Sequence, residues 1–129
     1  MAPSRWTTID RVTSLEPGQS AEGFRNIPNT LAIFDTHFPR FPVVPGILIM
    51  GSMGSLAAHL LEEETGKPWR MAAAEKVAFR HWAQPGDQMD VSVKLKERTD
   101  DEAVLSAEAS VEGNVITRVR KLRMEPAGS

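Results

Sequence analysis

The chain has 129 residues, with 15 lysines and arginines against 17 aspartates and glutamates, and its formal net charge is −2. A chain of this length commonly folds as one domain, and its balanced charge offers no basic footprint for nucleic acid. The sequence contains no cysteine, which excludes a disulfide framework, a thiolate nucleophile and a cysteine-based zinc site. We therefore expect a single domain over residues 1–129, compatible with a reducing cytoplasm.

Neither a secretory signal nor a membrane span is expected. The N-terminal residues reach Asp10 before any apolar run could form. The most apolar stretch, Pro42 to Leu61, is interrupted by glycine, serine and histidine and is too polar to cross a bilayer. These features favour a cytoplasmic protein.

The first predicted elements are two short strands, over residues 6–15 and 20–27. They flank a Pro-Gly turn signal at Pro17 and Gly18. Residues 28–46 hold four prolines, which lack backbone donors and restrict the residues before them. We expect an ordered loop there.

Residues 45–67 predict one helix. Pro45 stands at its first turn, Gly66 follows its last turn, and apolar residues occur on nearly every side. A helix that is apolar all round is a buried helix, so we expect it in the middle of the fold. Gly51 and Gly54 each cost roughly 1 kcal/mol relative to alanine in a helix. Their presence indicates a packing reason or an enlarged cavity.

The remaining sequence predicts strands, at residues 70–82, 88–98, 103–111 and 114–124. The last three alternate apolar and polar residues and are joined by short turns, which predicts an antiparallel meander. One long helix with a single antiparallel sheet around it is an α+β arrangement. The last strand also carries a basic bias, at Arg118, Arg120, Lys121 and Arg123.

His37 is the candidate general base. No two of the three histidines have the spacing of a metal site, and His59 and His81 are interpreted as surface or structural residues. His37 lies in the proline-rich apolar loop, where burial favours the neutral imidazole that accepts protons. The backbone N–H groups of Gly46 and Ile47 at the helix start can hold a developing oxyanion. These residues alone leave a purely structural histidine open.

The stretch HFPRFPVVPGILIMGSM, residues 37–53, resembles the His-Phe-Pro-Gly-x-Pro-x-x-Pro-Gly stretch of the 3-hydroxyacyl-acyl-carrier-protein dehydratases of type II fatty-acid synthesis. Residues 9–27 resemble that family's opening hairpin, and residues 75–95 its strand–turn–strand after the helix. The resemblance implies the hotdog fold, a curved antiparallel sheet around a central helix, and a dimer with active sites at the subunit interface. It also implies dehydration of a 3-hydroxyacyl thioester carried by acyl carrier protein, with no cofactor.

The resemblance assigns roles to individual positions. His37 would take the α proton of the substrate, the backbone N–H of Gly46 would donate to the thioester carbonyl, and the carbonyl of Val43 would orient the imidazole. Arg40 and Arg80 are candidates for contacting the phosphate of the carrier's phosphopantetheine through charge-assisted hydrogen bonds. The alternative is that both are ordinary surface arginines.

The main departure from the family is Gly51, which stands fourteen residues after His37, where the family has Glu or Asp. Thr36 and Arg40 also replace family glycines. Glycine has no side chain to transfer a proton, and losing a general acid or base costs about 10² to 10⁴ in rate. Elimination of water would therefore lose its acid.

Three explanations remain open. In the first, the chain is the histidine-bearing half of a heterodimer whose partner supplies the carboxylate. In the second, it forms a homodimer that uses a relocated carboxylate such as Asp35 or Glu75. In the third, it is a non-catalytic acyl binder or scaffold. A hotdog thioesterase is a further alternative. An enlarged cavity at Gly51 would suit a type II polyketide or polyene pathway.

Overall fold

The computed structural model describes residues 9–27, 46–81, 83–84 and 86–127. Its elements, in chain order, are β1 (Arg11–Glu16), β2 (Ser20–Asn26), α2 (Gly46–Thr65), β3 (Trp69–Phe79), β4 (Gln88–Arg98), β5 (Ala103–Val111) and β6 (Asn114–Pro126). The strands form one six-stranded antiparallel sheet in the order β1-β2-β4-β5-β6-β3. The predicted hairpin, long helix, meander and α+β class are therefore confirmed.

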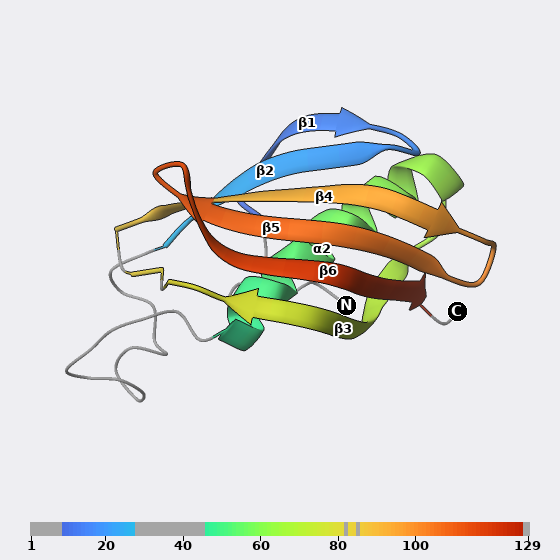
Figure 1. The fold of residues 1–129 in the computed structure, drawn as a ribbon. Helices are drawn as coiled ribbons and strands as arrows, with labels where there is room; N and C mark the ends of the chain where they lie inside the picture. Colours follow the sequence, from blue (N-terminus) through green and yellow to red (C-terminus); the bar gives the residue numbers. More distant parts are fainter. Residues whose placement is uncertain (1–8, 28–45, 82, 85, 128–129) are drawn as a thin grey trace.

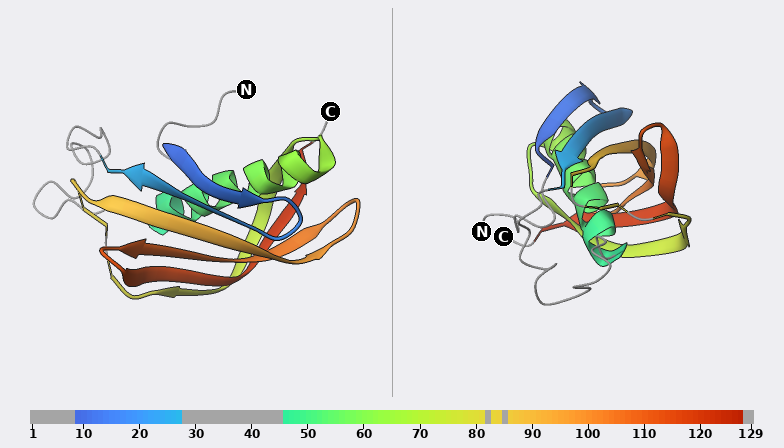
Figure 2. Two further views of the ribbon diagram at one scale, coloured as in Figure 1. Left: turned by 90° about the horizontal axis from the view of Figure 1, so that it is seen from above. Right: turned by 90° about the vertical axis from the view of Figure 1, so that its left-hand side faces the viewer.

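The sheet bends around α2, which lies along its concave side (Figures 1 and 2). One side of the helix and the inward-facing residues of the strands form the core. Its largest members are Ile49, Met53, Leu56, Leu60 and Leu61 from α2, with Met89, Val91, Val93, Leu105, Ile116, Leu122 and Met124 from the sheet. The strict alternation in β4 and β5 is what places these apolar residues on the concave side.

The C-terminal end of α2 is tied to the start of β3. Gly66 has a φ of 76°, a left-handed conformation that suits glycine, and its N–H donates to the carbonyl of Glu62 at 2.8 Å. The Thr65 hydroxyl accepts a hydrogen bond from Nε1 of Trp69 at 2.9 Å. Trp69 is thereby buried at the first position of β3, so helix and strand are held side by side.

Register shifts interrupt the meander at three points, one between β4 and β5 and two between β5 and β6. The register between β4 and β5 passes from Leu95↔Leu105 to Glu97↔Val104, so β4 carries one extra residue at Lys96. The register between β5 and β6 passes from Leu105↔Leu122 to Ala107↔Val119, so β6 also carries an extra residue. A bulge bends its strand and redirects side chains, and simple alternation in the sequence does not reveal it.

The helix is not buried on every side, contrary to the expectation from its composition. His59 and Glu62 are exposed, and Gly51, Ser55 and Ala58 are partly exposed. A single sheet covers only one side of the helix, and on the other side the apolar character comes from small residues with little area to bury. No helix in the described part of the chain is long and apolar enough to span a membrane.

Candidate active site

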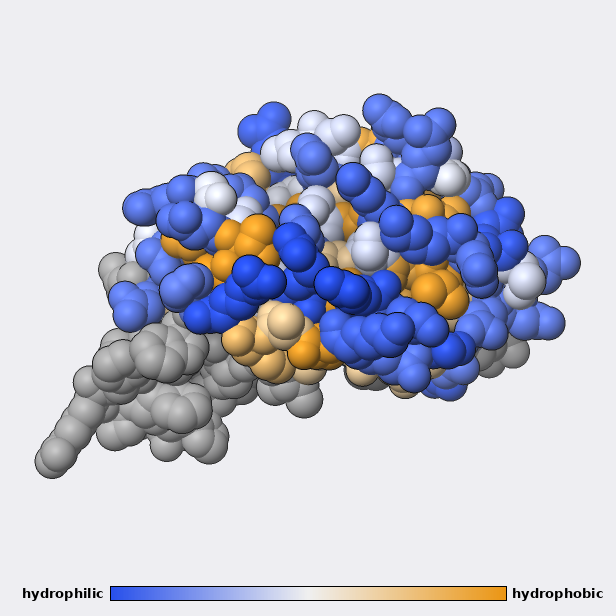
Figure 3. All heavy atoms as spheres, viewed as in Figure 1, coloured by the Kyte–Doolittle hydropathy of each residue, from blue (hydrophilic) through white to orange (hydrophobic). Residues whose placement is uncertain are grey.

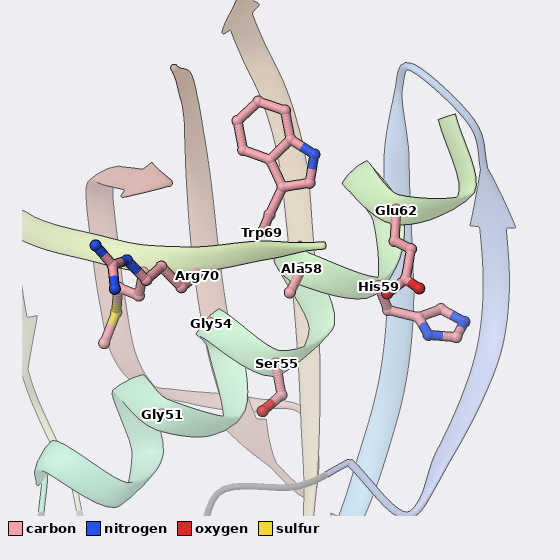
Figure 4. A pocket seen from close by; sticks show the side chains of 9 residues that line it. Gly51, Gly54, Ser55, Ala58, His59, Glu62, Trp69 and Arg70 are labelled. Carbon is pink, nitrogen blue, oxygen red and sulfur yellow. The ribbon is translucent and has the colours of Figure 1, made fainter. Parts of the chain in front are cut away.

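The exposed side of α2 and the start of β3 enclose an open hollow of about 360 Å³ (Figure 4). We call it the helix groove. Its lining residues are Gly51, Gly54, Ser55, Ala58, His59 and Glu62 from α2, and Trp69, Arg70 and Met71 from β3. The small residues lie on successive turns of the helix, so the groove follows the helix axis.

Gly54 sets how closely β3 approaches the helix. A Cβ atom at this position would lie 3.3 Å from the Cβ of Met71, tighter than an ordinary van der Waals contact. A larger side chain would push the strand away or fill the groove. The close approach of Met71 therefore explains why glycine, a poor helix former, occupies this position.

Gly51 lines the same groove, so a carboxylate at this position would point into it. Gly46 begins the helix, about 7.5 Å earlier along the axis at 1.5 Å per residue. The first N–H groups of a helix have no partner within the helix, which leaves them available to an oxyanion. The two positions that the resemblance predicts for the oxyanion donor and for the missing carboxylate, Gly46 and Gly51, therefore belong to one helix and lie a short distance apart.

Among the strands that the structure describes, the one beside the groove is an edge strand. β3 is last in the sheet order and pairs with β6, and most of its residues are exposed. They include two large apolar side chains, Met71 at 37% exposure and Phe79 at 54%. An edge of this length offers unpaired N–H and C=O groups to another chain. The groove thus opens beside a surface suited to a second subunit.

Three of the predicted site residues, His37, Arg40 and Val43, lie outside the described residues, as does Asp35. Arg80 is described: it is exposed, directly follows β3, and its backbone N–H donates to the carbonyl of Ile116 at 2.7 Å. The end of β3 and the start of α2 lie at the same end of the molecule (Figure 1). Arg80 and Gly46 are therefore at one end of the domain.

Glu75, a candidate for a relocated carboxylate, does not line the helix groove. It is exposed, and its carboxylate accepts a hydrogen bond from Nε of Arg123 at 2.5 Å. This hydrogen bond and the positive charge of Arg123 lower the pKa of Glu75. A carboxyl held in its ionised form is a poor proton donor.

The sequence did not single out His59 and Glu62 as groove residues. They are one helical turn apart, a spacing that places them on one face, but only the position of β3 shows that this face borders a hollow. No cluster of three or more histidine, aspartate or glutamate side chains that could hold a metal ion occurs within the described ranges.

The family model of the FabA-like domain matches residues 2–120. The chain belongs to the FabA-like family. It is 31% identical over 114 residues to the 3-hydroxyacyl-[acyl-carrier-protein] dehydratase FabZ of Bacillus subtilis, with 86% of this chain and 81% of that protein covered. It is 34% identical over 117 residues to FabZ of Clostridium botulinum strain Okra, with 88% and 81% covered.

The fold of this FabA-like chain is the hotdog fold. The dehydratase heterocomplex ApeI:P from Xenorhabdus doucetiae superimposes with a TM-score of 0.76 at 12% identity, covering 100% of this chain and 87% of that one. At this identity the similarity concerns the fold alone. The family and fold expected from the sequence are thus confirmed.

Proposed function

We propose that this chain is a dehydratase subunit that converts 3-hydroxyacyl groups on acyl carrier protein to trans-2-enoyl groups. The observation that carries the proposal is the similarity to FabZ dehydratases over 81% of their length. The motif from His37 to Gly46 supports it, because it retains the family's spacing of base and oxyanion donor.

His37 removes the α proton of the substrate. The negative charge that develops on the thioester oxygen is stabilised by the backbone N–H of Gly46, and the carbonyl of Val43 holds the imidazole in position. The bond between the β carbon and its hydroxyl oxygen then breaks, and the hydroxyl takes up a proton to leave as water. This last proton needs an acid, which Gly51 cannot supply.

We infer that a second hotdog subunit supplies the carboxylate. The helix groove lies open where the family has its Glu or Asp, and the neighbouring edge of β3 is suited to pairing with another chain. The pairing of Glu75 with Arg123 speaks against a relocated acid at that position. A dehydratase heterocomplex is described for ApeI:P, whose fold is similar.

Assays of 3-hydroxyacyl-carrier-protein dehydration test this proposal, with the chain alone and co-purified with a related hotdog chain that has Glu or Asp at the position matching Gly51. We expect the complex to turn over at least about 10² faster than the lone chain, the range for a general acid. His37→Ala in the complex should abolish that gain. Equal, robust turnover by the lone chain would contradict the heterodimer.

A non-catalytic acyl-binding subunit is the second candidate, and the glycine at position 51 favours it. It predicts that the protein retains acyl ligands, that no partner confers turnover, and that His37→Ala leaves its function intact. Release of free acid in the same assay would indicate a thioesterase instead.

For the carrier protein, we propose that Arg40 and Arg80 contact the phosphate of the phosphopantetheine arm. Arg80 is exposed at the end of the domain where α2 begins, as this role requires. Arg80→Gln should raise KM for the carrier-bound substrate and leave KM for a short thioester lacking the phosphate unchanged. An equal change in both KM values would contradict the contact.

A further inference from the structure

The outer face of the sheet, on the side away from α2, holds a second hollow of about 220 Å³. We call it the outer hollow. Its lining residues are Ser92, Lys94 and Lys96 from β4, Ser106, Ala107 and Glu108 from β5, and Arg118, Val119 and Arg120 from β6. Hydrophilic side chains cover much of this face (Figure 3).

The strand register arranges cations on both sides of Ser106. Lys94 of β4 is directly opposite Ser106 of β5. On the other side, the bulge in β6 places Arg120 and Lys121 together opposite Ser106, because the register runs from Leu105↔Leu122 to Ala107↔Val119. Adjacent strands are about 4.8 Å apart, so the backbones of β4 and β6 flank Ser106 at a separation of about 10 Å.

Lys96 adds another cation to the outer hollow. Lys96 is the extra residue of β4, and its side chain lines the hollow together with that of Lys94. Residues two apart on a strand face the same side of the sheet, so Lys94 and Lys96 both lie on the outer face of β4. Both strands that flank β5 are thus irregular at the point where they border the hollow.

The charge of the outer hollow is positive, although the whole chain is slightly acidic. Glu108 is the acidic lining residue, and it accepts a hydrogen bond from Nε of Arg118 at 2.8 Å. In the described part of the chain, no ion pair is made by Lys94, Lys96 or Arg120. Three cationic side chains without an ion-pair partner among the described residues therefore line the same hollow as Ser106.

The neighbouring surface limits the size of the ligand. A further hollow beside Ser92 and Glu108 is lined by Glu22 and Asp90 and is acidic. A nucleic-acid strand or a broad acidic protein surface laid across the sheet would meet these carboxylates. A compact anion seated over Ser106 would contact the cations and avoid them.

From this arrangement we propose that the outer hollow binds a small molecule through a phosphoryl group, centred over Ser106 between Lys94 and Arg120. Phosphate oxygens form short, charge-assisted hydrogen bonds to lysine and arginine and accept readily from a serine hydroxyl. With Lys96 as a third cation, a diphosphate group matches the site better than a single phosphate. The site lies on the opposite side of the sheet from the helix groove and is independent of the dehydratase activity.

Calorimetric titration of the full chain with inorganic pyrophosphate tests the proposal, with orthophosphate as the smaller probe. We expect pyrophosphate to bind more tightly than orthophosphate, and the affinity to fall as salt is added. Lys94→Gln and Arg120→Gln should each weaken binding about tenfold, equivalent to 1.4 kcal/mol. Arg11→Gln, which removes an exposed cation from β1 outside the hollow, is the matched control.

Three outcomes would overturn the proposal. The first is the absence of pyrophosphate binding at low salt. The second is equal weakening by Arg11→Gln and Lys94→Gln, which would indicate a diffuse charge effect. The third is binding of an acidic protein through Lys94 and Arg120 with no binding of pyrophosphate. Loss of binding in a variant counts only if its circular dichroism and urea midpoint match those of the wild type.

Discussion

The two sides of α2 differ in whether the chain's own sheet covers them. On the side facing the sheet, Met53, Leu56 and Leu60 are completely buried and contribute to a core that one chain completes by itself. On the other side, Gly51, Gly54 and Ala58 border an open groove next to an edge strand. The sheet-facing side stabilises the fold of the single chain. The open groove and the neighbouring edge strand on the other side are not needed for that stability.

The sheet-facing residues of α2 stabilise the fold, whereas we expect the groove residues to serve assembly and chemistry. Two glycines in a helix oppose its stability, so they persist because something must come close to the helix or fit beside it. Gly54 is explained by Met71 within the chain. Gly51 lines the same groove, and the resemblance to the dehydratases predicts that it replaces their acid.

The largest expected effect comes from restoring the carboxylate on the groove side. Gly51→Glu places a carboxylate in the groove at the family's spacing from His37, so a homodimer would contain complete sites. We expect dehydration by the lone chain to rise about 10² to 10⁴, the range for a general acid. Gly51→Gln, of the same size but without an acidic proton, should give no such rise. Equal activity of both variants would show that position 51 acts only through packing.

The next effect tests the sheet-facing side. Leu60→Ala removes a fully buried side chain and should lower the free energy of unfolding by about 2–5 kcal/mol, because it leaves a cavity. On the groove side, Ala58→Ser should change it by less than about 0.5 kcal/mol. Urea denaturation measures both. A comparable loss at Ala58 would mean that the groove side also belongs to the core of the single chain.

A smaller effect concerns association along β3. Phe79→Lys adds a charge to an exposed apolar position of the edge strand and should weaken association with a second hotdog chain about tenfold or more. The urea midpoint of the isolated chain should stay unchanged, since Phe79 contributes little to its core. Analytical ultracentrifugation gives the association constant, and Gln88→Lys on β4 is the control for added charge. Unchanged association would place the interface elsewhere.

The smallest effect concerns Glu75, which the sequence offered as a relocated acid. Because Arg123 lowers its pKa in the folded state, the ionised carboxylate stabilises the fold above its ordinary pKa of about 4.3. That stabilisation is lost as the pH falls through the lowered value. Glu75→Gln should therefore be slightly less stable than the wild type at pH 7, and the difference should disappear under strongly acidic conditions. A loss of dehydration activity in this variant would instead support a catalytic role for Glu75.

The sequence was sufficient to predict the elements and the α+β class, because strand alternation and helix punctuation are local signals. The motif at residues 37–53 was sufficient to predict the family. The burial of α2 was overestimated, since composition cannot distinguish a side covered by the chain's own sheet from one lined by small residues. The bulges at Lys96 and in β6 were also beyond sequence reasoning, as they depend on pairing between strands. The basic bias of β6 was visible, but not its juxtaposition with Lys94 across Ser106.

The eleven residues of β3 also bear on how cells must produce this protein. A newly made chain that finds no second subunit displays a long, alanine-rich strand to chaperones, proteases and other copies of itself. In the proposed heterodimer, its steady-state amount should then follow the supply of the companion chain rather than its own rate of synthesis. Balanced co-expression would thus be a condition for obtaining the protein intact as well as active.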